Sequence, residues 1–185
     1  MSFKDHNLVF ESDKIIDTDH DNMEVMMDWE HDIMKKSVEF ISQSKGDILE
    51  IGLGMGIASD YIQAQNVASH TIIEMHPQII EKLKIWAADK TNVTIVEGDW
   101  WDIKDTIGKY DGIFLDTFLD DNWSNFNQFI TEKGNPGAKI TYWNNYEEDY
   151  NEHNFSNISF EPIDILPPPN DYFSGTVYNM PKVEL

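Results

Sequence analysis

The chain contains no cysteine among its 185 residues. It therefore has no disulfide framework, no zinc–thiolate site and no thiol nucleophile. No apolar run approaches the roughly 18 residues that a membrane span requires, and no signal peptide opens the sequence. These absences predict a cytoplasmic protein that does not associate with a membrane.

Basic residues are also scarce, because 13 Lys and Arg stand against 34 Asp and Glu and give a net charge of −21. Such a surface repels a phosphate backbone, so nucleic acid is not an expected partner. It attracts cationic ligands, although most surface acids serve solubility alone. The length and the 41% hydrophobic content predict a single folded domain over residues 1–185. A monomer or a homodimer is expected.

A short apolar run from Ile113 to Leu115 follows a glycine and ends at Asp116. This pattern predicts a strand that is buried on both faces, with Asp116 at its carboxyl end. In open α/β sheets, ligands bind outside the carboxyl ends of the strands. Asp116 is therefore a candidate catalytic or ligand-holding group, and a cap for the next helix is the alternative.

The segment from Asp21 or Asn22 to about Ser42 has the periodicity of an amphipathic helix. Glu30 lies in the middle of its apolar stripe, where a carboxylate is unfavourable unless it is paired or hydrogen-bonded. We interpret Glu30 as a pocket carboxylate for a cationic group, and a groove edge open to water is the alternative. The stripe itself comprises Met23, Met26, Met27, Ile33, Met34, Val38 and Ile41.

Residues 1–20 are polar and irregular, and we expect them to form an N-terminal arm over the site. Asp19, His20 and Asp21 lie together near the end of this arm. No second group of ligands has matching spacing, so we expect no metal site.

Three glycines in Gly52–Gly56 follow an expected strand at Ile48–Ile51 and precede a helix expected to end near Gln65. Glycine lets the backbone adopt positive φ and approach a ligand closely. The spacing is G-x-G-x-G, with Ile57 where a dinucleotide fingerprint has its last Gly or Ala. No Lys-Ser/Thr pair follows, so this is not a P-loop. Glu50 suits a cationic ligand end better than a pyrophosphate.

Two further strand ends carry acids. Glu74 ends the expected strand from Thr71, about 20 residues after the glycines, where a ribose-holding carboxylate lies in nucleotide-binding folds. After the expected strand 93–96, Asp99 and Trp100 combine a carboxylate with an aromatic face, as an adenine pocket needs. Helix caps and core packing are the alternatives.

Five expected strands alternate with helices, and two more lie close together near the end of the chain. This order predicts an α/β fold with a Rossmann-like, seven-stranded sheet, mostly parallel, with an antiparallel strand at its C-terminal edge. The remaining expected elements are helices at Pro77–Ala88 and about 122–132, and strands at 138–143, 158–166 and 172–180.

The order of these motifs resembles that of class I S-adenosylmethionine-dependent methyltransferases. More narrowly, it is similar to guanidinoacetate N-methyltransferase and the related arginine δ-N-methyltransferase. The resemblance covers residue 25 to the end. The matching motifs are Trp29-Glu30, E-x-G-x-G-x-G at 50–56, I-I-E at 72–74, E-G-D-W at 97–100 and D-G-I-x-x-D-T at 111–117.

The resemblance implies S-adenosyl-L-methionine as cofactor and S-adenosyl-L-homocysteine as product. In the family, two carboxylates grip the guanidino group of the substrate, which implies catalytic and substrate-binding roles for Glu30 and Asp116. Main-chain groups that bind a substrate carboxylate correspond to Asn145 and Tyr146. The cofactor-binding positions correspond to Met26, Met34, Gly52, Leu53, Gly54, Met55, Gly56, Ile57, Glu74, Met75, His76, Asp99, Trp100 and Asp116.

Two departures from the family pattern concern the acceptor. Phe118 stands where the family usually has Tyr, and a short, very acidic segment after Asn144 replaces a longer helical region. We predict an N-methyltransferase for a guanidino or other cationic amine group of a small molecule such as guanidinoacetate. An arginine methyltransferase for peptides or proteins and a non-catalytic S-adenosylmethionine-binding protein are the alternatives.

Overall fold

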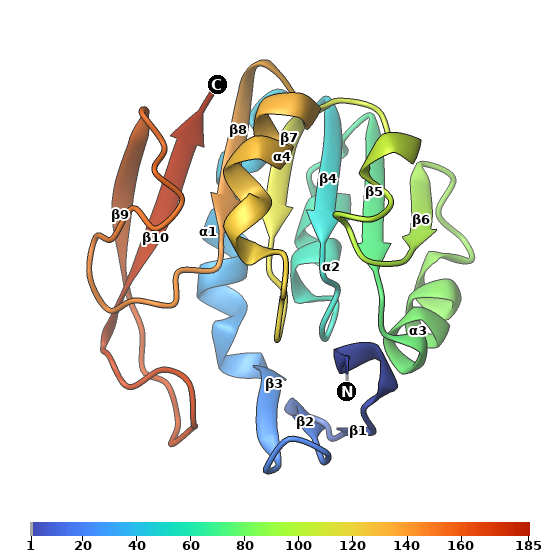
Figure 1. Cartoon of the computed structure of the whole chain (residues 1–185), viewed down its shortest axis with the longest axis vertical. Coiled ribbons are helices and arrows are strands. Elements are labelled where there is room, and N and C mark those ends of the chain that lie inside the picture. Colours follow the sequence, from blue (N-terminus) through green and yellow to red (C-terminus); the bar gives the residue numbers. More distant parts are fainter. Residues whose placement is uncertain (1) are drawn as a thin grey trace.

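The computed structural model describes residues 2–185, and its larger sheet has seven strands in the order β6-β5-β4-β7-β8-β10-β9 (Figure 1). Strands β4 to β8 are parallel, and β10 runs antiparallel to both of its neighbours. The expected mixed sheet is confirmed, with β10 between β8 and the edge strand β9. The strands are β4 (Asp47–Ile51), β5 (Ser69–Glu74), β6 (Val93–Glu97), β7 (Tyr110–Leu115), β8 (Gly134–Tyr142), β9 (Ile158–Asp164) and β10 (Val177–Glu184).

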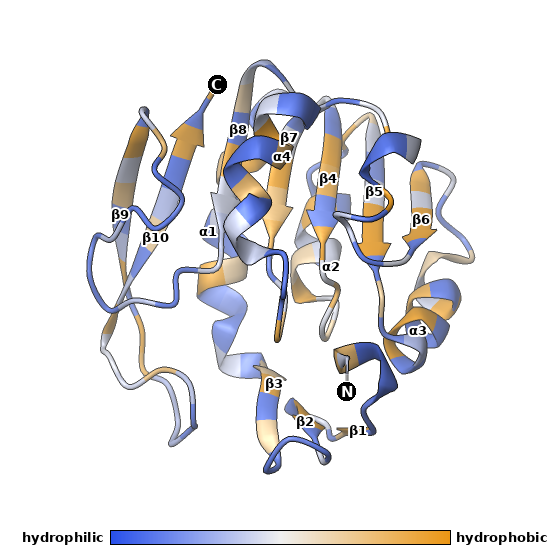
Figure 2. Ribbon diagram, viewed as in Figure 1, coloured by the Kyte–Doolittle hydropathy of each residue, from blue (hydrophilic) through white to orange (hydrophobic). Residues whose placement is uncertain are grey.

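Helices cover both faces of this sheet, because its central strands consist mostly of apolar residues (Figure 2) and need burial on each side. Phe114 of β7 packs in the core formed with α1 (His31–Ile41) and α2 (Ile57–Ala64), whereas Ile113 and Leu115 pack with α4 (Phe126–Lys133) on the other face. Helix α3 (Pro77–Ala87) contacts β6. Within residues 2–185, every helix is too short or too polar to cross a bilayer.

The register of the parallel strands places three candidate residues side by side. Ile51 of β4 pairs with Ile73 of β5 and also with the last residue of β7. The residues at the next level are Gly52, Glu74 and Asp116, which therefore form one row at the carboxyl edge of the sheet. This row is where an open α/β sheet binds ligands.

A smaller antiparallel sheet lies across this carboxyl edge (Figure 1). The sheet contradicts the expectation that residues 1–20 are irregular; Met1 lies outside the described residues. Its strands are β1 (Leu8–Phe10), β2 (Lys14–Asp17) and β3 (Met23–Met27), with the short 3₁₀ turns η1 (Phe3–Asp5) before it and η2 (Asp28–Glu30) after it.

The expected helix beginning at Asp21 or Asn22 is wrong in its first half. These two residues adopt φ values of 50° and 58° in the turn between β2 and β3, so they do not cap a helix. The residues Met23–Met27 pair with β2 as a strand. Their spacing happens to continue the apolar stripe of α1, which begins only at His31.

Strand β10 lies later in the chain than expected. The side-chain oxygen of Asn170 accepts hydrogen bonds from the N–H groups of Tyr172 and Phe173, at 3.0 and 2.7 Å, and holds both in a turn. The strand begins at Val177 and continues through Pro181. Elsewhere, β8 begins directly after α4, and the remaining short elements are the 3₁₀ turns η3 (Lys104–Thr106) and η4 (Trp123–Asn125).

Candidate functional site

A cavity of about 410 Å³ lies at the carboxyl edge of the large sheet. Its walls come from the loops after β4 to β8, from β3 and η2, and from the loop before β10. In the described part of the chain, no Lys, Arg or His side chain lines it. Six carboxylate side chains do, namely those of Glu24, Glu30, Glu74, Asp99, Asp116 and Asp120.

Glu30 and Asp116 both line this cavity, although they are distant in sequence. Glu30 is 3% exposed, and its Oε1 accepts hydrogen bonds from the N–H of Met27 at 2.7 Å and the hydroxyl of Tyr172 at 2.6 Å. The Asp116 carboxylate accepts no hydrogen bond from residues 2–185, and it keeps partial exposure to the cavity. Asp116 is therefore available to a ligand, and Glu30 is held in place by its neighbours.

The electrostatic environment disfavours two anions at this end of the cavity. Burial and, to a smaller extent, the charge of Asp116 raise the pKa of Glu30 to about 8, against the opposing hydrogen bonds from Tyr172 and Met27. Burial, followed by the charge of Glu50, raises the pKa of Asp116 to about 7. Neither carboxylate has an ion pair within residues 2–185. A bound cation would neutralise the negative charge of both carboxylates.

This arrangement makes cation binding depend on pH. Because both folded-state pKa values are raised, the carboxyls of Glu30 and Asp116 carry protons below about pH 7 and lose them toward about pH 8. A guanidinium ligand should therefore bind more tightly as the pH rises from 6 to 9, and its binding near pH 7 should release protons. The unliganded protein should lose stability as the pH rises from about 4 to 8, since the unfolded carboxyls ionise at about 4.

Titration calorimetry with agmatine in the presence of S-adenosylhomocysteine, in buffers of different ionisation enthalpy, counts the released protons. Glu30→Gln should release fewer. No proton release at pH 7 would show that these carboxyls do not meet the cation.

The loop Gly52–Gly56 joins β4 to α2 with its three glycines at φ values of 86°, 53° and 79°. A Cβ on Gly54 would overlap the sulfur of Met26, and one on Gly52 would overlap the carbonyl oxygen of Asp116. Side chains at these positions would displace the loop from its neighbours at the cavity wall. The loop therefore forms a backbone cradle beside the acidic residues.

Glu74 is fixed by three backbone donors. Its Oε1 accepts from the N–H groups of Met75 and His76, both at 2.8 Å, and its Oε2 accepts from the N–H of Leu53 at 2.9 Å. Burial raises the pKa of Glu74, and these bonds oppose the shift. An ionised carboxylate offers about four acceptor positions, so Oε2 retains one for a ligand hydroxyl. The glycine loop thus suits close contact of the protein backbone with S-adenosylmethionine, and the Glu74 carboxylate suits the hydroxyl groups of its ribose.

Asp99 and Trp100 also line the cavity. Asp99 accepts from the N–H of Trp101 at 2.8 Å and from the side-chain amide of Asn122 at 3.0 Å. Trp100 is 3% exposed and donates its indole N–H to Asp120 at 2.7 Å. The alternative of core packing thus holds for most of the Trp100 ring.

Several predicted cofactor positions do not line the cavity. Met34 is fully buried in the core, in the same cluster as Phe114 of the large sheet. His76 is also fully buried, and it caps α3 instead. The positions outside the cavity lining are Met34, Leu53, Met55, Gly56, Ile57 and His76, whereas Met26 and Met75 are part of it.

Of the two residues predicted to bind a substrate carboxylate, only one lies at the cavity. Asn145 lines the cavity, but Tyr146 does not and is 39% exposed. The N–H of Tyr146 donates to the side-chain oxygen of Asn144 at 2.9 Å. This turn uses the N–H that a substrate carboxylate would need.

The expectation that Glu50 suits a cationic ligand is wrong. Glu50 is fully buried and does not line the cavity. Its Oε2 accepts hydrogen bonds from the hydroxyl of Ser59 at 2.5 Å and from His70 at 2.8 Å. Because the Glu50 side chain turns toward α2 and β5, it acts inside the fold, beneath the glycine loop.

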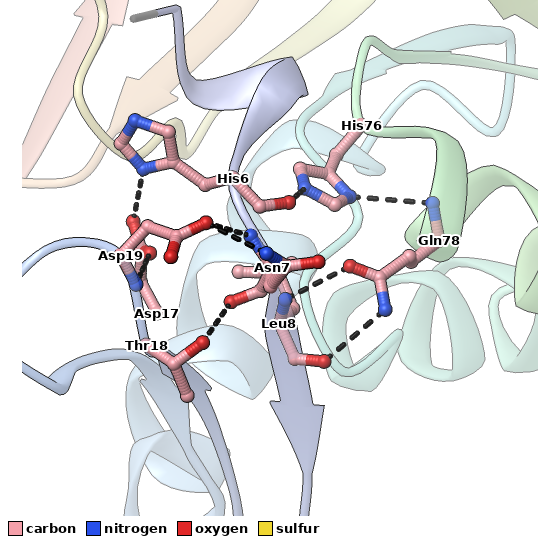
Figure 3. A network of polar contacts seen from close by, with 8 residues as sticks. All are labelled: His6, Asn7, Leu8, Asp17, Thr18, Asp19, His76 and Gln78. Atoms are coloured by element: carbon pink, nitrogen blue, oxygen red, sulfur yellow. Dashed lines mark hydrogen bonds and ion pairs between the residues drawn. The ribbon is translucent and has the colours of Figure 1, made fainter.

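The N-terminal segment docks on the start of α3 (Figure 3). The Gln78 side chain accepts from the N–H of Leu8 at 2.8 Å and donates to its carbonyl at 3.2 Å. His76 accepts from the N–H of Gln78 at Nδ1, so its Nε2 carries the proton and donates to the carbonyl of His6 at 3.1 Å. Phe3, at the beginning of this segment, lines the cavity.

Sequence reasoning missed the aromatic residues around Glu30. Tyr172 stacks on Trp29 with ring centroids 6.0 Å apart and lies edge-on to Trp143 at 6.0 Å. Aromatic faces attract cations. The signal that was available is Asn170, a turn-forming residue after three prolines, which favours a loop over the strand that we expected for Tyr172.

The fold is similar to that of spermidine synthase from Thermotoga maritima, with a TM-score of 0.66 and 13% identity over 96% of this chain and 71% of that chain. A putative S-adenosylmethionine-dependent methyltransferase from Streptococcus mutans gives a TM-score of 0.64 and 10% identity, over 97% of this chain and 55% of that chain. The chain thus has the fold of the S-adenosylmethionine-dependent methyltransferases. The family model for guanidinoacetate N-methyltransferase matches residues 11–159, and the chain belongs to this family.

The curated relatives that the chain resembles are proteins named protein arginine N-methyltransferase 2. The chain is 40% identical over 138 residues to protein arginine N-methyltransferase 2 of Aspergillus oryzae, which covers 71% of this chain and 32% of the relative. It is 41% identical over 106 residues to the protein of the same name from Saccharomyces cerevisiae. This match covers 51% of this chain and 26% of the relative. The chain spans about a third of the length of the relatives that it matches. The resemblance deduced from the motifs is confirmed.

Proposed function

We propose that this chain is an S-adenosylmethionine-dependent N-methyltransferase that acts on a guanidino group. The observation that carries the proposal is that Glu30 and Asp116 line one cavity without any cationic side chain of residues 2–185 beside them. A guanidinium is planar and donates paired hydrogen bonds to carboxylates. The two acids therefore match the charge and the donor geometry of this acceptor.

The cofactor would lie against the Gly52–Gly56 loop, with Glu74 toward its ribose and Asp99 and Trp100 beside its base. When bound, it supplies a methyl group on a positively charged sulfur, and S-adenosylhomocysteine is the product.

The residues of the chain have to make a poor nucleophile reactive. The lone pairs of a guanidinium are delocalised, and its pKa exceeds about 12. Glu30, oriented by Tyr172 and Met27, fixes the guanidino plane and draws positive charge toward the nitrogens that it contacts. Asp116 accepts the proton that the methylated nitrogen loses. Its pKa of about 7 suits a general base at neutral pH.

An arginine side chain in a peptide or protein is the second candidate acceptor. The curated relatives are named protein arginine N-methyltransferase 2, which favours this acceptor over free guanidinoacetate. The matched region covers 32% of the first of these relatives. The non-catalytic alternative is disfavoured because both carboxylates are present at the cavity.

The test is a methylation assay with labelled S-adenosylmethionine and four acceptors: guanidinoacetate, arginine, agmatine and an arginine-containing peptide. We expect label transfer to at least one guanidino group, with S-adenosylhomocysteine released in equal amount. If S-adenosylhomocysteine raises the melting temperature but no acceptor is labelled, the chain binds the cofactor without the proposed activity.

A further inference from the structure

We infer that the acceptor is a guanidine that carries a second cationic group and no carboxylate. The inference rests on the proposed function, because it concerns the acceptor end of the same cavity. Three observations lead to it: the closed turn at Asn144, the acidic segment that follows, and the charge of the cavity wall.

The turn at Asn144 leaves few free hydrogen-bond donors for a substrate carboxylate. Asn144 is fully buried, and its side-chain oxygen accepts the N–H of Tyr146 at 2.9 Å. Its side-chain amide donates to the carbonyls of Glu148 at 3.2 Å and Asn179 at 2.9 Å, and its own N–H donates to the hydroxyl of Tyr178 at 2.7 Å. These four hydrogen bonds fix the turn, and a substrate carboxylate would have to displace the Asn144 side-chain oxygen to reach the N–H of Tyr146.

The residues that follow bring further negative charge to the rim. Glu147, Glu148 and Asp149 are all exposed and come directly after Asn145 and Tyr146. Glu147 accepts a hydrogen bond from the hydroxyl of Ser174 at 2.7 Å. Because Ser174 belongs to the same loop as the cavity residue Tyr172, this bond joins the acidic segment to a loop that lines the acceptor end.

Within residues 2–185, little positive charge compensates these acids. The chain contains no arginine. Among the six cavity carboxylates, only Glu24 forms an ion pair within residues 2–185, with Lys14 at 3.6 Å. A carboxylate on the acceptor would meet like charges from both the wall and the rim, whereas an ammonium group would be attracted by them.

A charge series on one carbon skeleton tests the inference. Agmatine, butylguanidine and 4-guanidinobutyrate share the guanidino group and a four-carbon chain and end in a positive, neutral or negative group. At low ionic strength we expect kcat/KM for agmatine to exceed that for butylguanidine by about 10-fold, and that for 4-guanidinobutyrate by about 100-fold. These ratios should shrink in 1 M salt, since the Debye length then falls to about 3 Å.

A matched pair of variants locates the effect. The triple variant Glu147→Gln, Glu148→Gln, Asp149→Asn should lower the agmatine to 4-guanidinobutyrate ratio at least about fivefold, because it removes three rim charges. The control Glu39→Gln, Glu81→Gln, Glu132→Gln changes the net charge equally at exposed helix positions that do not line the cavity, and it should leave the ratio unchanged.

The outcomes separate this inference from the proposed function. If 4-guanidinobutyrate or guanidinoacetate is methylated as fast as agmatine, the guanidino activity stands and the dicationic acceptor is wrong. An arginine-containing peptide without a further cationic group that outperforms agmatine would overturn the inference in the same way. If no guanidine is methylated while S-adenosylhomocysteine binds, the proposed function itself fails, and the inference fails with it.

Discussion

Asp116→Asn should lower turnover of a guanidino acceptor by about 10³-fold, because general-base catalysis contributes about 10² to 10⁴. The amide has the size of the carboxylate but cannot take up a proton at neutral pH. No group in residues 2–185 donates to the Asp116 carboxylate, so the substitution breaks no hydrogen bond in the fold. After burial, the charge of Asp116 is the second cause of the raised pKa of Glu30, and the substitution removes it, so stability at pH 8 should not fall.

Single-turnover methylation, the affinity for S-adenosylhomocysteine and the melting temperature measure these effects separately. Asp102→Asn is the matched control, because Asp102 is exposed and does not line the cavity. It should keep the wild-type rate. A wild-type rate in Asp116→Asn would remove Asp116 from the mechanism, and loss of cofactor affinity would move its role to the cofactor.

Glu30→Gln should raise KM for the guanidino acceptor by about 10- to 100-fold, since a hydrogen bond to a charged group is worth about 1.5–3 kcal/mol. Glutamine keeps a side-chain oxygen that can accept from Met27 and Tyr172, at the positions where Glu30 accepts at 2.7 and 2.6 Å. The fold should therefore survive. The substitution removes the negative charge and places amide N–H donors opposite the N–H donors of a guanidinium. Both changes weaken binding of the acceptor and leave the fold unchanged.

Steady-state kinetics at saturating S-adenosylmethionine separate KM from kcat in this variant. Tyr172→Phe is the companion variant. It removes one hydrogen bond to Glu30 and keeps the charge, so it should raise KM by less than Glu30→Gln. An unchanged KM in Glu30→Gln would show that the acceptor does not reach this carboxylate.

Two different sequence patterns predicted Asp116 and Glu30, and both residues line the same cavity. Asp116 was predicted from a strand end, and the structure places it at that strand end, in the row with Gly52 and Glu74. Glu30 was predicted from a helical stripe, but the first half of that helix is the strand Met23–Met27. Glu30 nevertheless lines the cavity, because the apolar residues before and after it bury this part of the chain in either conformation, and its role toward a ligand stays a prediction.

Other expectations failed where a contact distant in sequence decided the outcome. Met34 followed the same stripe as Met26, yet only Met26 lies at the cavity, since it belongs to β3 and packs on the glycine loop. Tyr172 looked like a strand residue, and the Asn170 side chain holds it in a turn instead. Glu50 lies next to the glycine loop in sequence, but Ser59 and His70 hold it inside the fold.

The sequence by itself determined the sheet, the glycine cradle and the acids at its carboxyl edge. Each of these depends on a few adjacent residues: an apolar run for a buried strand, glycines for positive φ and an acid where the strand stops. Only the tertiary structure decided which acids share one cavity, that the N–H of Tyr146 is already used, and that a tyrosine 142 residues away orients Glu30. Such contacts follow from the packing of β3, η2 and the loop before β10, and packing between distant segments leaves no local pattern in a sequence.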